Sequence, residues 1–296
     1  MNAFERLLVG ESPELKALIR TAQIAALTDV PLMIIGGSGS GKTLMAQAAH
    51  QHSPRYRGPM IELNCGLLEL ERLENGWNSA RGGTLVLEDL GDLPSASQAR
   101  LLMLLEQNPE THTRDTKGQV QNVRVITTLG SDLFERVENG QFRRDLYFRL
   151  KVVPLELPGL KERTGDASFL FQHITLEFAR RYQVNRPYLT RGAEQAIARY
   201  SWPGNVRELK NLCERMVILL AGKAIDVTNL PREMQEPAQQ NTRFQLPDSG
   251  LSLDDLERDM IKQALERTVG NRSRAARLLG ITRDTLLYRL KKYAIQ

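Results

Sequence analysis

The residues from 36 to 43 have the types and spacing of a phosphate-binding loop, because they fit the pattern G-x-x-x-x-G-K-[S/T]. Glycines let the backbone approach phosphate oxygens closely, and a following helix adds the positive end of its dipole. Lys42 is then expected to pair with the β- and γ-phosphates of ATP, while the Thr43 hydroxyl holds Mg²⁺. The alternative is a ligand-free turn between a strand and a helix. The predicted nucleotide-binding residues are Gly36, Gly37, Ser38, Gly39, Ser40, Gly41, Lys42 and Thr43.

A pair of acids forms the second chemical motif. Thr84 to Leu87 is a short apolar or β-branched run, and Glu88 and Asp89 follow it directly. A buried strand of this kind can deliver one carboxylate, Glu88, to Mg²⁺ and the other, Asp89, to an attacking water. Alone, the pattern fits equally well two acids that cap a strand at the surface. The phosphate-binding loop upstream favours the catalytic interpretation.

Positive charge is concentrated at the C-terminal end of the chain. The formal net charge is +5, and the stretch from Asn271 onward contains seven basic residues and one acid. The first 270 residues therefore hold 33 bases and 34 acids, which nearly cancel. This segregation indicates that the C-terminal region binds an acidic polymer such as DNA.

The same region has the pattern of a helix-turn-helix. A short helix is expected from Ser273 to Leu279, a turn at Gly280-Ile281, and a second helix that starts at Thr282. The second helix is expected to read base edges in the major groove, with lysines at its end on backbone phosphates. The alternative is an ordinary basic helical hairpin. The predicted DNA-binding residues are Arg272, Ser273, Thr282, Arg283, Asp284, Thr285, Tyr288, Arg289, Lys291 and Lys292.

The elements that must position these residues alternate between strand-like and helical runs as far as residue 163. Predicted strands span Leu32–Ile35, Met60–Leu63, Thr84–Glu88, Val123–Thr128 and Val152–Leu155, which predicts an α/β fold with a doubly wound parallel sheet. Such sheets bind nucleotides at the carboxyl ends of their strands, where the phosphate-binding loop falls.

Helical spacing replaces this alternation farther along the chain. We predict an α/β nucleotide-binding part over 1–163, a helical lid over 164–234, a polar linker over 235–250 and an all-α DNA-binding domain over 251–296. The helix after the linker has Leu253, Leu256, Met260, Ala264 and Leu265 on one face. That face is expected to pack in a three-helix unit, or to contribute to a dimer interface.

Composition argues against secretion and membrane insertion. Cys65 and Cys213 are far apart and form no C-x-x-C pair, which argues against a disulfide framework and a cysteine zinc site. The N-terminal residues lack the basic and apolar regions of a signal peptide, and no apolar run is long enough to cross a bilayer. We therefore expect a cytoplasmic protein that does not bind a membrane.

Taken together, these motifs resemble the bacterial enhancer-binding activators of sigma-54 RNA polymerase, which are AAA+ ATPases with a Fis-type helix-turn-helix. The resemblance covers nearly the whole chain. It rests on the phosphate-binding loop, on Asn64-Cys65, and on motifs listed by their ranges: 9–13, 29–31, 82–85, 91–94, 142–150, 202–209 and 271–281.

The resemblance implies roles for three arginines and an oligomer. Arg143 and Arg149 match the arginine-finger pair that reaches the γ-phosphate in a neighbouring subunit, and Arg207 matches the second sensor on the lid. A guanidinium group neutralises charge that develops during phosphoryl transfer. A site shared between subunits implies a homo-oligomer, hexameric when active, with a DNA-binding dimer as a resting form. Dimers would bind inverted repeats in promoter or enhancer DNA.

Three departures from the family pattern bear on activity. The family carries a long insertion between Asn64-Cys65 and Gly82-Gly83 whose Gly-Ala-Phe-Thr-Gly-Ala loop grips sigma-54, and here only 66–81 fills that interval. The acids, ordinarily Asp then Glu, stand as Glu88 then Asp89. Gly130 occupies the position of the first-sensor Asn, and glycine has no side chain to sense a phosphate. ATP binding is expected, and hydrolysis is expected to be slow or absent.

Three functions fit these observations. The first is a sequence-specific DNA-binding transcription regulator whose AAA+ domain binds ATP and does not activate sigma-54 polymerase by itself. It would act by repression, by direct contact with polymerase, or in a mixed oligomer with a full-length relative. The second is an ATP-hydrolysing activator that remodels polymerase through another loop, such as 108–119, or in a mixed oligomer. The third is a DNA-binding module with a vestigial AAA+ scaffold.

Overall fold

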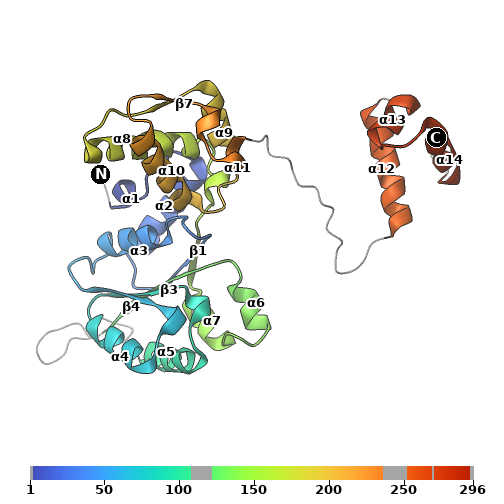
Figure 1. The fold of residues 1–296 in the computed structure, drawn as a ribbon. Coiled ribbons are helices and arrows are strands. Elements are labelled where there is room, and N and C mark those ends of the chain that lie inside the picture. Colours follow the sequence, from blue (N-terminus) through green and yellow to red (C-terminus); the bar gives the residue numbers. More distant parts are fainter. Residues whose placement is uncertain (1–2, 108–121, 236–251, 269, 294–296) are drawn as a thin grey trace, which may run out of the picture. The chain divides into compact units, whose positions relative to one another are not determined.

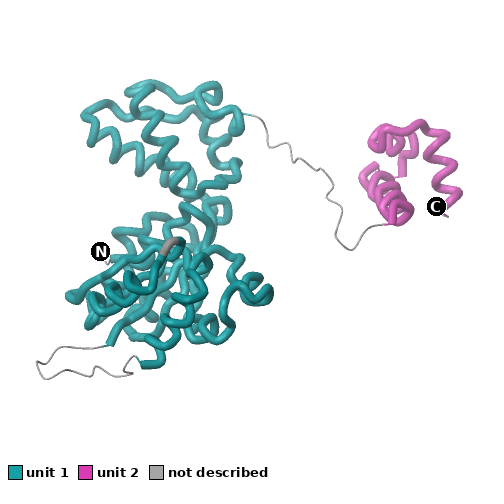
Figure 2. Tube along the Cα trace, turned by 60° about the horizontal axis from the view of Figure 1, so that its bottom comes forward, with its two compact units in different colours: residues 1–238 teal, residues 239–296 magenta. Residues whose placement is uncertain are grey.

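The structure is a computed structural model that describes residues 3–107, 122–235, 252–268 and 270–293. The chain divides into two compact units, Met1–Ala238 and Gln239–Gln296, each of which is described by itself (Figure 2). The predicted linker over 235–250 and the polar stretch 108–119 fall almost entirely outside the described residues.

A parallel five-stranded sheet forms the centre of the first unit (Figure 1). Its strand order is β2-β3-β4-β1-β5, and every neighbouring pair is parallel. The five strands agree with the predicted runs to within one residue at each end: β1 Leu32–Ile35, β2 Met60–Asn64, β3 Thr84–Glu88, β4 Arg124–Leu129 and β5 Val153–Glu156. The predicted α/β fold with a doubly wound parallel sheet is therefore confirmed.

Both faces of the sheet are covered by helices, so the strands are apolar on both sides. Along β1, Leu32 and Ile34 are buried on one side with Phe4 and Met45, whereas Met33 is buried on the other. The first face is covered by α1 Ala3–Leu7, α2 Pro13–Ala26 and α3 Lys42–Gln51. The second is covered by α4 Leu70–Ser79, α5 Ser95–Gln107, α6 Leu133–Glu138 and α7 Arg144–Leu150, with short turns η1 Cys65–Leu67 and η2 Leu90–Asp92 between strands and helices.

The lid follows the sheet and has a core of its own. Its largest fully buried side chain is Trp202, whose indole N–H donates to the carbonyl of Ile197 at 3.0 Å. Trp202 has a φ of 51°, in the left-handed region that side chains rarely adopt, so the loop before α10 is held by its packing. The lid elements are η3 Leu160–Glu162, α8 Asp166–Tyr182, β6 Tyr188–Leu189, α9 Arg191–Arg199, α10 Asn205–Leu219, β7 Ala224–Ile225, η4 Val227–Asn229 and α11 Arg232–Gln235.

The second unit consists of three helices, α12 Leu253–Arg267, α13 Arg272–Leu278 and α14 Arg283–Lys292. Its small core contains Ile261, Ala264 and Leu286. The predicted packing face of α12 is correct only toward its C-terminal end, because Leu253 is 79% exposed and Met260 is 39% exposed. The apolar core of the unit involves the later turns of α12, where Ile261, outside the predicted set, is buried.

Candidate nucleotide site and DNA-reading helices

The phosphate-binding loop connects the carboxyl end of β1 to the first turn of α3. Gly39 and Gly41 have φ values of 73° and 109°, which glycine adopts without the strain that a Cβ would cause. A Cβ on Gly39 would also overlap the Gly204 carbonyl oxygen of the lid. The two glycines are therefore required by backbone conformation at 39 and 41, and by the close approach of the lid at 39.

Lys42 lies against its own loop. Its Nζ donates to the carbonyl oxygens of Gly36 and Gly37 at 2.8 and 3.2 Å. Burial lowers the pKa of the Lys42 ammonium and Arg207 lowers it further, while Asp89 and Glu88 act in the opposite direction. The Lys42 ammonium group therefore lies on the loop itself, where the sequence predicts that it meets the phosphates.

The acids at the end of β3 lie beside the loop, as predicted. The Thr43 hydroxyl donates to Glu88 Oε1 at 2.6 Å, so the two predicted Mg²⁺ ligands are in direct contact. A hydroxyl and a carboxylate are the hard oxygen donors that Mg²⁺ prefers, with nucleotide phosphates supplying further oxygens. The described residues contain no denser group of metal-binding side chains, and a nucleotide-borne Mg²⁺ does not require one.

Two residues that were not among the predicted site residues contact Asp89. The Asn64 amide donates to Asp89 Oδ2 at 3.4 Å, and the Asp89 backbone N–H donates to the Thr128 hydroxyl at 3.4 Å. Asp89 has a φ of 54°, a conformation that aspartate tolerates better than most residues. The signal that could have found Asn64 is its place one position after the predicted strand β2, next to β3 in the sheet.

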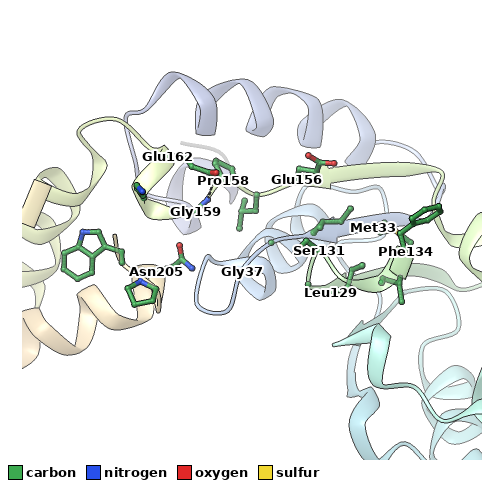
Figure 3. Close-up of a pocket in the computed structure, with 18 of the residues that line it drawn as sticks. Met33, Gly37, Leu129, Ser131, Phe134, Glu156, Pro158, Gly159, Glu162 and Asn205 are labelled. Carbon is green, nitrogen blue, oxygen red and sulfur yellow. Dashed lines mark hydrogen bonds between the residues drawn. The ribbon is translucent and has the colours of Figure 1, made fainter. Parts of the chain in front are cut away.

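The lid closes over the loop from one side. Arg207 Nη1 donates to the Ser38 hydroxyl at 3.0 Å, which places the predicted second sensor on the phosphate-binding loop. Arg163, which is 4% exposed, donates to the Ser40 carbonyl at 2.8 Å. Asn205 lies beside Gly37 and Gly159 in Figure 3. Of these lid residues, the sequence predicted only Arg207 at the nucleotide site.

A cavity of about 880 Å³ lies at the carboxyl ends of β1, β4 and β5, with the lid residues Trp202 and Pro203 at its border (Figure 3). Its lining includes Gly36 and Gly37 but does not include Lys42, Thr43 or Glu88. The predicted phosphate contacts therefore belong to the loop, and the cavity lies beside them.

The two predicted arginine fingers lie on the surface around α7. Arg143 forms an ion pair with Asp145 at 2.7 Å, and this pairing raises the pKa of the guanidinium. Arg149 is exposed one residue before the end of the helix. Surface placement is what a residue that reaches into a neighbouring subunit needs, and the finger role stays a prediction.

The interval between Asn64-Cys65 and Gly82-Gly83 is compact. It contains the turn η1 and the ten-residue helix α4, and Ala80 to Gly83 then lead directly into β3. Trp77 and Leu73 of α4 are buried in the core. This interval therefore forms part of the fold and projects no long loop.

In the second unit, α13 and α14 form the predicted helix-turn-helix. Thr282 caps α14 by accepting from the Thr285 N–H at 3.2 Å, and Gly280 makes the turn with a φ of 67°. None of the predicted DNA-binding residues in α14 and its cap is fully buried. Thr285 and Arg289 are half-buried, and the exposed ones include Thr282, Arg283, Asp284 and Tyr288. The remaining predicted residues, Arg272, Ser273, Lys291 and Lys292, are exposed.

Two of the predicted DNA-binding side chains are engaged by acids of α12. Arg289 forms an ion pair with Glu257, and Lys292 Nζ donates to Asp254 at 2.8 Å, which raises the pKa of the Lys292 ammonium. Their contact with DNA would require these pairs to open. Ion pairs at a protein surface are weak because water screens them, so DNA phosphates can compete for both cations.

Three family models match the chain, each over a different segment. They describe a sigma-54 interaction domain at residues 9–160, an AAA+ ATPase lid domain at 161–246 and a bacterial regulatory protein of the Fis family at 252–293. The chain belongs to the sigma-54 interaction family. It therefore joins an AAA+ domain of the ATP-binding type to a Fis-type DNA-binding domain, as the sequence predicted.

Relatives of this family match nearly the whole chain. The transcriptional regulatory protein ZraR of Salmonella typhimurium is 37% identical, across 96% of this chain and 68% of that protein. The DNA-binding transcriptional regulator NtrC of Escherichia coli is 32% identical, across 98% and 70%. Among solved structures, NtrX from Brucella abortus in complex with ATP is 29% identical with a TM-score of 0.68, across 96% of this chain and 68% of NtrX.

None of the described helices has the length and apolar character needed to cross a bilayer.

Proposed function

We propose that this protein is a sequence-specific DNA-binding transcription regulator whose AAA+ domain binds ATP with Mg²⁺ and does not activate sigma-54 polymerase by itself. The observation that carries the proposal is the compact interval of 66–81, where α4 takes the place of the sigma-54-gripping loop of the family. Nucleotide would tune oligomerisation or DNA affinity, and the protein would act in the cytoplasm.

Several contacts support ATP binding in this proposal. The loop glycines have the required conformations, Thr43 contacts Glu88 at 2.6 Å, and Arg207 reaches Ser38 at 3.0 Å. Solved relatives include NtrX in complexes with ATP and with ADP. We assign Lys42 to the phosphates, Thr43 and Glu88 to Mg²⁺, and Asp89 to the attacking water, in a chain whose turnover is slow.

DNA binding in this proposal rests on α14. Arg283 and Tyr288 would read base edges, and the exposed Lys291 would meet a phosphate. A dimer would place two such helices on half-sites about one helical turn apart, roughly 34 Å, or a multiple of that distance. Arg143 and Arg149 would act across subunits in any larger ring.

Transcription in vitro from a sigma-54 promoter tests the proposal. The protein alone is expected to give no ATP-dependent open complex, although a full-length activator of the same family does so in a parallel reaction. Open-complex formation by this protein alone would overturn the proposal and would favour an activator that remodels polymerase through another loop.

A second candidate function is a working ATPase that remodels polymerase by another route or in a mixed oligomer. The observation in its favour is that both acids lie in ordered contacts, Glu88 with Thr43 and Asp89 with Asn64. ATP turnover that is lost in both Lys42→Ala and Arg143→Ala would support it. Absence of specific nucleotide binding at millimolar ATP would instead favour a DNA-binding module with a vestigial AAA+ scaffold.

A further inference from the structure

Three consecutive carbonyl groups of the phosphate-binding loop accept hydrogen bonds from the lid. The Ser38 carbonyl accepts from Asn205 Nδ2 at 2.9 Å. The Gly39 carbonyl accepts from two backbone N–H groups at the start of α10, those of Val206 and Arg207, at 3.1 and 3.3 Å. The Ser40 carbonyl accepts from Arg163, as described above. The lid therefore contacts the backbone carbonyl groups of the loop, in addition to the Ser38 hydroxyl that Arg207 contacts.

Asn205 is the side chain that joins this contact to the hinge of the lid. Its Nδ2 donates to the Ser38 carbonyl, and its Oδ1 accepts from the Leu160 N–H at 2.8 Å, at the point where the chain leaves the sheet. Asn205 is 7% exposed and has a φ of 51°. A Cβ on Gly37 would lie 3.0 Å from Nδ2, and one on Gly159 would lie 3.2 Å from Oδ1. The amide thus fits tightly between two glycines, with both of its polar atoms bonded.

Holding a carbonyl also fixes the next N–H in the chain. A peptide group is planar and trans, so its C=O and the N–H of the following residue point in opposite directions. The bond from Asn205 to the Ser38 carbonyl therefore turns the Gly39 N–H away from the lid, and the bond to the Ser40 carbonyl does the same for Gly41. The Ser40 N–H makes a long bond of 3.3 Å to Gly37 O within the loop. Loop N–H groups are the donors that a phosphate needs.

We propose that Asn205 is a positioning residue for nucleotide binding, which holds the Ser38–Gly39 peptide so that the Gly39 N–H faces the phosphates and which ties this orientation to the lid hinge. The proposal rests on the proposed ATP binding and extends it to a residue that need not touch the nucleotide. By linkage, a nucleotide that selects this loop conformation also stabilises the lid position that provides Asn205.

The test is the affinity for an ADP analogue that carries a fluorescent label, measured with Asn205→Asp between pH 8 and pH 5.5. An ionised aspartate keeps the acceptor for Leu160 and loses the donor to Ser38, so the analogue should bind about tenfold or more weakly than to the wild type at pH 8. A protonated aspartate regains an O–H donor, and burial favours that form. The ratio of variant to wild-type Kd should therefore fall toward one as the pH falls.

Two further variants make the test specific. Asn205→Gly keeps the left-handed backbone and removes both bonds, so it should bind about tenfold or more weakly at every pH. Asn185→Asp makes the same chemical change at an exposed position of the lid and should bind as the wild type does. Thermal unfolding without nucleotide checks that each variant is folded, and Asn205→Gly keeps the test available if Asn205→Asp is unstable.

Each result separates this inference from the proposed function. Absence of binding by the wild type would overturn the proposed ATP binding. Binding by the wild type that is unchanged in Asn205→Gly and Asn205→Asp would overturn the inference alone. A weakened Asn205→Asp whose ratio to the wild type does not vary with pH would also overturn it, since a general disturbance of the lid would not be relieved by a proton.

Discussion

The double variant Glu88→Asp/Asp89→Glu, which exchanges the two acids at the end of β3, is expected to hydrolyse ATP about 10²-fold faster than the wild type. Glu88 Oε1 lies 2.6 Å from the Thr43 hydroxyl. Removing one methylene retracts the carboxylate by about 1.5 Å, which leaves roughly 4 Å between the two oxygens for a metal ion to bridge. The added methylene at 89 carries the other carboxylate about 1.5 Å farther from the backbone, toward an attacking water. A displacement of about 1 Å in a catalytic group can change a rate about 10²-fold.

The assay is phosphate release at saturating ATP and Mg²⁺, with ATP affinity measured in parallel to show that the site is filled. Each single variant is expected to hydrolyse ATP more slowly than the double variant, because each leaves one acid at the wrong length. Glu71→Asp, an exposed change of the same kind on α4, serves as the control. A double variant that binds ATP and turns it over no faster than the wild type would refute the argument that the acid order limits hydrolysis.

Three further predictions concern the first-sensor position, the DNA-binding helix α14 and the buried His50. Gly130→Asn, which restores a side chain at the first-sensor position, should raise the preference for ATP over ADP about tenfold; an unchanged ratio in competition binding would contradict this. Arg283→Ala should weaken operator binding by about 1–3 kcal/mol in a fluorescence anisotropy titration. Arg289→Ala should weaken operator binding less than Arg283→Ala does, because Arg289 must first leave Glu257, and Glu257→Gln should strengthen operator binding. A larger loss in Arg289→Ala than in Arg283→Ala, or weaker binding by Glu257→Gln, would reject these roles in DNA binding. Burial and Arg124 lower the pKa of His50, so the unfolded chain binds a proton more readily, and stability should fall as pH drops below about 6.5. His50→Gln should flatten this dependence in denaturant unfolding at pH 7.5 and 5.5, and an equally steep dependence would exclude His50 as its source.

The sheet could be predicted from the sequence because each strand is a short apolar run between turns. The prediction for β1 and β3 was correct at both ends, and β2, β4 and β5 differ by one residue. A strand that is buried on both faces needs continuous apolar residues, and this pattern can be recognised without knowing which strands pair with it. The contact of Thr43 with Glu88 follows from the same sheet, since β1 and β3 both lie next to β4.

Contacts between elements that are distant in the sequence could not be predicted in this way. Asn64 meets Asp89 only because β2 pairs with β3 in a register that sets Asn64 opposite Glu88. Asn205 and Arg163 meet the phosphate-binding loop only because the lid folds back over it. The spacing of residues within one helix or strand does not indicate which residues of other elements they will contact.

The second unit shows the limit of helical periodicity. An apolar stripe predicts which residues share one face, but it does not indicate how much of that face is covered. Leu253 lies on the predicted face and is 79% exposed, although Lys292 of α14 reaches the adjacent Asp254. The engagement of Arg289 by Glu257 likewise depends on the crossing of α12 and α14.

The most direct test of the central claim is ATP binding and turnover measured together, with and without DNA, on the wild type and on Lys42→Ala, while the assembly state is followed. We predict that the wild type binds ATP, that its turnover is slow or absent, and that ATP changes its assembly or its DNA affinity. Lys42→Ala should lose the ATP effect and keep DNA binding. Fast turnover that rises as the protein assembles would contradict the claim and would show Arg143 and Arg149 acting across subunits.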